Sequence, residues 1–354
     1  MSRFEVHWEI KELFLKNVFT IARGSKASVK NVFLTISKDE IQGFGEAGPN
    51  TRYDETAETV IKFFEKFPFE ELHQINSPKD LELLIEIESA KIKKFNMIGD
   101  SISNPQSAKS AIEMAWLDWW AKSQHQPLWK LWEASTNTGP VTSYTIGLDE
   151  ISVMQRKIKE ADQYPLYKIK LGTDHDRGII EGIRKVTDKP LRVDANEGWK
   201  TVDQAKREIE YLQKNGIKIV EQPMHSSRQK ELRELKKWSP LPLMADESFT
   251  GTELLEDIAE QFDIINIKLM KIGSLIKAKR TIEEAHALGL EVMIGCMIES
   301  SLAITAGGVL ALFCKYADLD GNLLISNDPF SGLKVLENGR IKLTNNAGLG
   351  VNFF

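Results

Sequence analysis

The chain has 354 residues, a net charge of −5 at pH 7 and two cysteines. It has no basic tract interleaved with aromatic residues, which excludes the usual signature of nucleic-acid or membrane-surface binding. Cys296 and Cys314 are too few for a disulfide framework, and no apolar run approaches the roughly 18 residues of a membrane span. The N-terminus MSRFEVHWEI lacks an apolar leader, so we expect a cytoplasmic protein without nucleic-acid or membrane partners.

Residues 1–47 alternate apolar and polar side chains, as antiparallel strands do. The segments FEVHWEI, KNVFLTIS and IQGFGEA are separated by expected loops at 20–30 and 38–40. Helical patterns follow over 54–66, 78–93 and 106–122. We therefore expect an α+β capping domain over residues 1–125.

Eight short apolar runs lie between residues 142 and 320, and most end on a polar or charged residue. The functional residues at these ends, from Lys168 to Asp318, are 22 to 28 residues apart, the length of one strand, one turn and one helix. Repeated strand-helix units of this kind predict an α/β fold with a (β/α)8, TIM-like barrel over 126–320. The runs are VTSYTIGL, LYKIKLG, LRVDAN, IKIVEQP, PLMADES, IINIKLM, EVMIGCMIES and YADLD. We expect the C-terminal segment, 321–354, to pack on the cap.

Three carboxylates, Asp194, Glu221 and Asp246, end three consecutive predicted strands. The C-terminal ends of barrel strands meet at one face, so these side chains should converge. With no histidine or cysteine among them, the set favours Mg²⁺ over zinc or copper. The alternative is that they pair with lysines of neighbouring strands or cap the helices that follow.

Three lysines accompany these carboxylates. Lys168 and Lys170 are two residues apart on one predicted strand and point to the same side of it. Lys268 ends the sixth strand, which lies across an eight-stranded barrel from the second. We expect two effects to lower the pKa of these paired lysines: the repulsion between the two ammonium groups and the charge of a nearby cation. A lowered pKa would suit a general base. The alternative role is simple neutralisation of a carboxylate.

The segments VDANEGW, VEQP, MADES, INIKLMK and the K-x-K of YKIKLG resemble the enolase superfamily, in the subgroup with muconate lactonizing enzyme. The resemblance covers essentially the whole chain, including GFGEAGPNTRYDET at 43–56. It implies removal of a proton alpha to a carboxylate, with Mg²⁺ stabilising the resulting dianion. By this resemblance Asp194, Glu221 and Asp246 are metal ligands, Lys168 helps to hold the substrate carboxylate, and Lys170 and Lys268 are the two acid/base groups.

Two bases on opposite faces would invert a stereocentre, since one removes the proton and the other returns one to the far side. Asp318 and Asp320 lie on one side of the last predicted strand and need a cation, for which a substrate ammonium would serve. The D-x-D of ADLDG is similar to the element with which dipeptide epimerases bind the free amino group. GCMIES and FTIARGSK also resemble that family. The alternative for the aspartate pair is a surface turn or a helix cap.

The further substrate-binding candidates are Thr145, Arg23, Cys296, Met297 and Ile298. In the family that the chain resembles, the loop near Arg23 closes over the site, and an arginine there can receive a glutamate side chain. By this resemblance Arg23 and Lys26 could do so here, whereas Phe19, Met297 and Ile298 could equally line an apolar pocket. We therefore expect a Mg²⁺-dependent dipeptide epimerase, an isomerase acting on Ala-Xaa dipeptides with glutamate or an aliphatic residue second. A cycloisomerase or lyase of the same superfamily, such as o-succinylbenzoate synthase or a lactonizing enzyme, is the alternative. The resemblance also leaves a homo-oligomer open.

Overall fold

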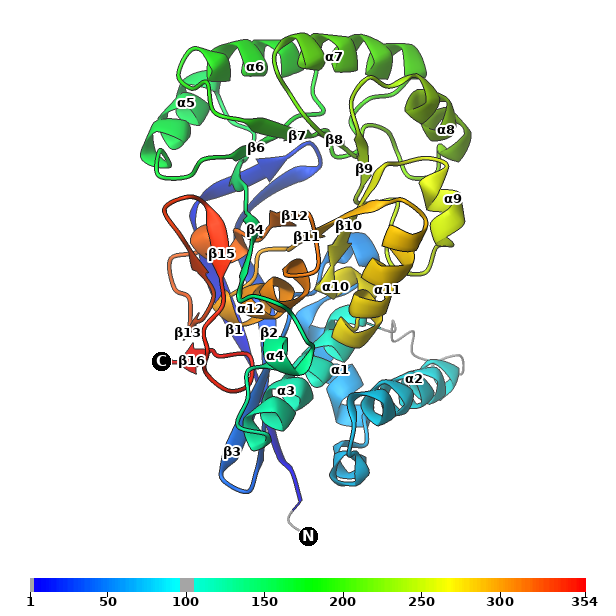
Figure 1. Ribbon diagram of the computed structural model, residues 1–354, viewed down its shortest axis with the longest axis vertical. Coiled ribbons are helices and arrows are strands. Elements are labelled where there is room, and N and C mark those ends of the chain that lie inside the picture. Colours follow the sequence, from blue (N-terminus) through cyan, green and yellow to red (C-terminus); the bar gives the residue numbers. More distant parts are fainter. Residues whose placement is uncertain (1–2, 96–104) are drawn as a thin grey trace.

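The computed structural model describes residues 3–95 and 105–354. The first part of the chain folds into a three-stranded antiparallel sheet with helices against it (Figure 1). The strands are β1 Glu5–Ile21, β2 Gly24–Lys38 and β3 Ile41–Ala47, and the helices are α1 Ala57–Lys66, α2 Pro78–Phe95 and α3 Gln106–Ser123. The described part of this cap also contains the 3₁₀ turns η1 Thr51–Tyr53 and η2 Phe69–Gln74.

The cap sheet is held against α3 by the alternation of its strands. Val32, Leu34 and Ile36 of β2 point to one face and are at most 1% exposed. Glycines in β3 let α3 come close, because a Cβ added at Gly45 would lie 2.0 Å from the Ala111 carbonyl oxygen. The apolar face predicted from the period of two is therefore the face that buries the helix.

The predicted loop at 20–30 is wrong. β1 and β2 pair to their tips, with Ile21 opposite Gly24, so only Ala22 and Arg23 form the turn. The polar residues of this stretch suggested a loop, but they lie on a long exposed hairpin that extends from the cap to the barrel (Figure 1). Exposed strands need no alternation of apolar residues, which is why the sequence pattern failed here.

The eight predicted barrel strands are all present and form one sheet in sequential order. They are β5 Tyr144–Ile146, β6 Tyr167–Lys170, β7 Leu191–Asp194, β8 Val220–Glu221, β9 Leu243–Ala245, β10 Ile264–Lys268, β11 Glu291–Gly295 and β12 Tyr316–Asp318. A parallel bridge between Thr142 and Ala317 joins the last strand to the start of the first. The predicted (β/α)8-type barrel with a preceding α+β cap is thus confirmed.

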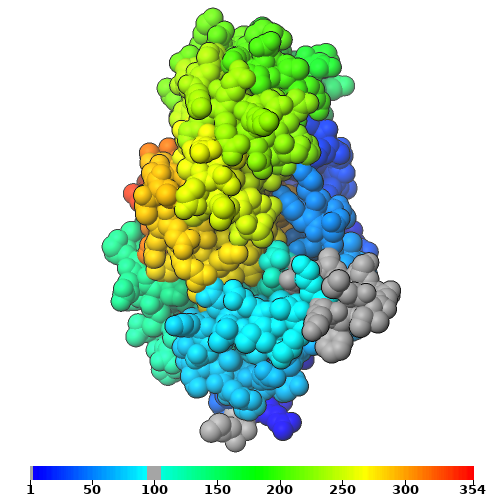
Figure 2. All heavy atoms as spheres, turned by 90° about the vertical axis from the view of Figure 1, so that its right-hand side faces the viewer, coloured from blue at the N-terminus to red at the C-terminus, as the bar shows by residue number. Residues whose placement is uncertain are grey.

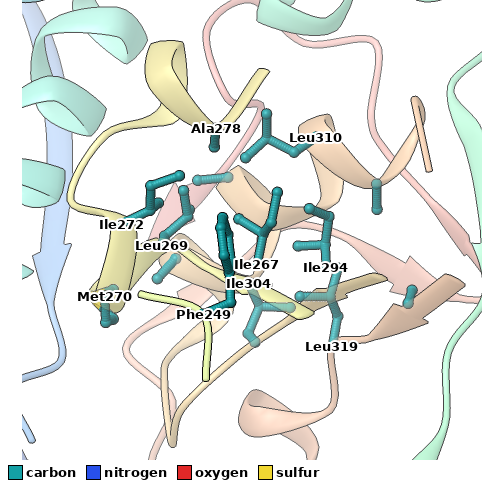
Figure 3. Packing of buried hydrophobic residues seen from close by; sticks show 14 of the residues in the cluster. Phe249, Ile267, Leu269, Met270, Ile272, Ala278, Ile294, Ile304, Leu310 and Leu319 are labelled. Carbon is teal, nitrogen blue, oxygen red and sulfur yellow. The ribbon is translucent and has the colours of Figure 1, made fainter. Parts of the chain in front are cut away.

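Helices follow the first seven strands and cover the barrel. They are α5 Ile151–Glu160, α6 Asp176–Arg184, α7 Val202–Lys214, α8 Gln229–Trp238, α9 Leu255–Ala259, α10 Leu269–Ile272 with α11 Leu275–Ala287, and α12 Ser301–Ala311. After β12 the chain forms the 3₁₀ turn η4 Gly321–Leu323 in place of a helix. Figure 3 shows the apolar packing beneath the sixth to eighth strands, where Ile267, Ile294 and Leu319 meet Phe249 and the helices.

The C-terminal tail returns to the cap, as expected. Phe330 of β13 (Phe330–Ser331) stacks on Phe33 and meets Phe44 edge to face, at ring-centroid distances of 5.9 and 5.4 Å. The other short strands are β4 Thr138–Val141, β14 Lys334–Val335, β15 Arg340–Lys342 and β16 Asn352–Phe353. The short helix α4, Leu128–Leu131, precedes β4. The tail therefore joins cap and barrel.

A second contact between the two parts lies on the side shown in Figure 2, where the cyan helices of the cap meet the gold α11. Arg280 of α11 bonds Glu82 of α2 there, with N–O distances of 2.9 and 3.1 Å. Among the described residues, no helix is long and apolar enough to cross a membrane.

Candidate active site

A cavity of about 500 Å³ lies between the C-terminal ends of the barrel strands and the cap. The cap contributes the β1–β2 hairpin and η1 to its wall. Most sequence-predicted site residues line it: Arg23, Thr145, Lys168, Lys170, Asp246, Lys268, Cys296, Met297, Ile298, Asp318 and Asp320. Asp194 and Glu221 lie close by without lining it, and both are at most 2% exposed.

The three predicted metal ligands form one cluster. Each of Asp194, Glu221 and Asp246 offers a carboxylate oxygen, and these atoms all lie within 4.8 Å of one another. The register of the parallel strands causes this convergence, since Asp194 pairs with Glu221 across β7 and β8, and Asp246 directly follows β9. An all-oxygen set of buried carboxylates fits Mg²⁺.

Lysines contact all three ligands. Lys170 donates to Asp194 at 2.7 Å and Lys268 to Asp246 at 2.8 Å. Lys168 lies 2.8 Å from Glu221 and 3.3 Å from Asp194. The alternative that these carboxylates pair with neighbouring lysines is therefore also realised.

Burial and neighbouring charges shift the pKa values of these carboxyl groups in different directions. Burial alone would raise the pKa of Asp194, but Lys170 and Lys168 lower it to about 2. Burial and the charge of Asp194 raise the pKa of Glu221 to about 7. A cation at this point would favour the ionised form of Glu221.

The lysines differ from the expectation in one respect. Burial alone would lower the pKa of Lys168 and Lys268, but Asp318 and Glu221 raise that of Lys168, and Asp246 raises that of Lys268. Direct contact with carboxylates therefore opposes, at Lys168, the lowering expected of the Lys168–Lys170 pair, and that lowering stays a prediction for the cation-bound site. Their positions match the expectation: β6 and β10 are separated by three strands in an eight-stranded order, so Lys170 and Lys268 line the cavity from opposite sides.

The two aspartates at β12 have different partners. Asp318 accepts hydrogen bonds from Lys168 at 2.8 Å and from the Ser143 hydroxyl at 2.6 Å. Asp320 accepts one from the Thr145 backbone N–H at 2.6 Å, and burial together with Asp318 raises its pKa to about 6. Lys168 is thus one cation beside this aspartate pair, and the binding of a substrate ammonium there stays a prediction.

Arg23 at the tip of the cap hairpin reaches across the cavity to the barrel. Its guanidinium donates to Glu247 at 2.6 Å, to Glu197 at 3.2 Å and to the Asn196 carbonyl oxygen at 3.1 Å. The hairpin also contacts the opposite rim, where the Leu148 N–H donates to the Thr20 carbonyl oxygen at 2.8 Å. Arg23 therefore joins the cap to the barrel through two carboxylates.

Several of these residues were not predicted from the sequence. Glu197 and Glu247 lie within segments quoted for the resemblance, but nothing in the local pattern linked them to a cap residue more than 170 positions away. Lys271 was also missed, although it follows Lys268 by one helical turn. It is 3% exposed and bonds Asp246. A lysine within an apolar stretch was the signal available.

Two family models match the chain: Mandelate racemase / muconate lactonizing enzyme, N-terminal domain, over residues 9–132, and Enolase C-terminal domain-like, over 153–353. An L-Ala-D/L-Glu epimerase of Bacteroides thetaiotaomicron is 39% identical over 96% of this chain and 85% of its own. The chain belongs to the dipeptide epimerase family of the enolase superfamily.

Other members of the dipeptide epimerase family are also similar. An L-Ala-D/L-amino acid epimerase of Pedosphaera parvula is 36% identical over 91% of both chains. A crystal structure of a dipeptide epimerase from Enterococcus faecalis V583, complexed with Mg and the dipeptide L-Leu-L-Tyr, superposes with a TM-score of 0.85. It is 30% identical and covers 99% of this chain and 100% of that one.

Proposed function

We propose that this chain is a Mg²⁺-dependent dipeptide epimerase that inverts the alpha carbon of the C-terminal residue of an Ala-Xaa-type dipeptide. The observation that carries the proposal is the pair of opposed lysines, Lys170 and Lys268, beside a buried carboxylate cluster. The relatives named above act on dipeptides or are complexed with them, and one is complexed with Mg.

Asp194, Glu221 and Asp246 would hold the metal ion. When bound, Mg²⁺ supplies positive charge next to the substrate carboxylate and to the three ligands that otherwise contact lysines. Lys168, with two carboxylates within 2.8 Å, is suited to bind the substrate carboxylate through charge.

Inversion needs one group on each face of the alpha carbon. In one direction the neutral amine of one lysine, Lys170 or Lys268, takes the alpha proton. The electron pair moves into the substrate carboxylate to give an enediolate. The ammonium of the other lysine then delivers a proton to the opposite face, and the product has the opposite configuration with no net gain or loss of protons.

The substrate's free ammonium would bind at Asp320. Asp320 is 3% exposed and lines the cavity, and its nearest described hydrogen-bond partner is the neutral backbone N–H of Thr145. Lys168 donates its hydrogen bond to Asp318, so a cation bound at Asp320 would balance the charge of that second carboxylate directly. This feature favours a dipeptide over the lyase and cycloisomerase substrates, which require no ammonium site.

Side-chain preference at the second residue follows from the cap wall. Phe19, Ile21 and Val29 of the cap hairpin give this wall an apolar lining, and Met297 and Ile298, which follow barrel strand β11, extend it. Arg23 is bonded to two barrel carboxylates, so an uncharged second residue fits the wall without breaking an ion pair. Two more cap cations among the described residues line the cavity: Arg52, which lies 3.1 Å from Glu197, and Lys26, which could meet a glutamate side chain.

The test is a library of Ala-Xaa dipeptides incubated with enzyme and Mg²⁺ in D₂O, followed by mass spectrometry and chiral chromatography. We expect deuterium at the alpha carbon of the C-terminal residue together with the epimeric product. A library without exchange, using enzyme that is folded and binds Mg²⁺, would reject the proposal.

A further inference from the structure

Lys271 is a buried ammonium at the metal cluster that the proposed reaction does not use. It lies in the short helix α10, one turn after Lys268, and its side chain is 1% exposed. The described lining of the cavity includes Lys168, Lys170 and Lys268 but not Lys271. A substrate in the cavity therefore has no access to this amine.

All three N–H groups of Lys271 have a close acceptor. They lie 2.8 Å from Asp246 Oδ1, 2.5 Å from the Asp246 carbonyl oxygen and 2.8 Å from the Phe249 carbonyl oxygen. An ammonium has three donors, so these acceptors satisfy it. The ammonium thus fixes both the side chain of Asp246 and the backbone of the loop that follows β9.

Asp246 differs from the other two ligands in the donors that its two carboxylate oxygens accept from. The second oxygen of Asp194 accepts from the Asn196 backbone N–H, and that of Glu221 from the Asn266 side-chain amide, both at 2.9 Å. These donors are neutral. Asp246 alone among the three has an ammonium on each oxygen, Lys268 on Oδ2 and Lys271 on Oδ1.

The surroundings of Lys271 are densely packed. Figure 3 shows its chain neighbours Leu269 and Ile272 in the core with Phe249, whereas Met270 lies to one side, and each of the three neighbours is at most 4% exposed. The loop is held from the other side by Gln222, whose Oε1 accepts from the backbone N–H groups of Asp246 and Ser248. Lys271 therefore holds Asp246 from a fixed point, whereas Lys268 borders the substrate.

We propose that Lys271 is a positioning residue that fixes the Asp246 carboxylate for cation binding and keeps a charge partner on it when Lys268 engages the substrate. This inference rests on the proposed function only in taking Asp194, Glu221 and Asp246 as the cation site. A mere counter-charge predicts the opposite effect on metal affinity, because an ammonium near a cation site repels the cation.

The experiment is calorimetric titration of the full chain with Mg²⁺ alone, comparing wild type with Lys271→Met. We expect the dissociation constant for Mg²⁺ to rise about tenfold or more, as is typical when a group that orients a metal ligand is removed. The matched control is Lys122→Met. Lys122 also bonds a buried carboxylate and a backbone carbonyl, Asp118 and Gln42, but in the cap, so its loss should leave Mg²⁺ affinity unchanged.

Unchanged or tighter Mg²⁺ binding by folded Lys271→Met would overturn the inference. Should that variant fail to fold by circular dichroism, crystal structures of the wild type with and without Mg²⁺ decide the question. We expect the contact between Lys271 and Asp246 Oδ1 in both, and its loss on Mg²⁺ binding would refute the role. Wild type that binds no Mg²⁺ would instead reject the metal site and the proposed function.

Discussion

The two walls of the cavity hold their charges in different ways. On the barrel wall, carboxylates and lysines from neighbouring strands contact one another in nearly full burial, and strand register sets their positions. On the cap wall, Arg23 at the tip of one long hairpin contacts Glu197 and Glu247, and Arg52 of η1 also contacts Glu197. The two arginine side chains are 36% and 37% exposed. The groups proposed for chemistry thus lie on packed barrel strands, which suits precise catalysis. An exposed hairpin closes the cavity, which suits substrate entry.

The barrel wall should be the more sensitive to loss of one charge, and Asp320→Asn tests this. The change keeps an acceptor for the Thr145 N–H and removes the negative charge proposed to bind the substrate ammonium. We expect kcat/KM for dipeptides to fall about 100-fold, equivalent to roughly 2.7 kcal/mol. Steady-state kinetics measure this, and an unchanged kcat/KM would favour a substrate without an ammonium group.

On the cap wall, Arg23→Gln should weaken closure rather than substrate recognition. We expect kcat/KM to fall roughly tenfold, equivalent to about 1.4 kcal/mol, and by the same factor for Ala-Glu and Ala-Leu. Lys26→Gln, on the same hairpin, is the control and should not affect Ala-Leu. A loss confined to Ala-Glu would mean that Arg23 leaves its barrel partners and binds the substrate side chain.

At the interface between the cap and the barrel we expect a smaller effect, a dependence of folding stability on pH. Glu113 of α3 accepts a hydrogen bond from the Ile276 N–H of α11 at 2.7 Å, and burial raises its pKa to about 8. The unfolded chain releases this proton near pH 4.5, so the folded state holds the extra proton between these values and loses stability as pH rises through them.

Glu113→Gln keeps an acceptor and removes this titration. We expect its thermal midpoint to exceed that of the wild type by about 2 °C at pH 8 and to match it near pH 5. Differential scanning calorimetry across this range measures the difference. If the thermal midpoints of the two proteins change with pH in parallel, the titration of Glu113 does not contribute to the pH dependence of stability.

The sequence predicted the barrel wall well and the cap wall poorly, for physical reasons. Strand ends in a parallel barrel meet at one face, so Asp194, Glu221 and Asp246 could be brought together from spacing alone. Arg23 contacts residues that no local period links to it, and the exposed strands around it lack apolar alternation. Lys271 was missed because a lysine one turn into a helix normally reads as a solvated side chain.

The central claim is that Lys170 and Lys268 act from opposite faces of one carbon. It is tested most directly by following deuterium exchange of both epimers of one Ala-Xaa dipeptide in Lys170→Ala and Lys268→Ala with Mg²⁺. We predict that neither variant epimerises, that each retains exchange of one epimer only, and that the two variants retain opposite epimers. Exchange of the same epimer by both variants, or of both epimers by either, would contradict the two-sided arrangement.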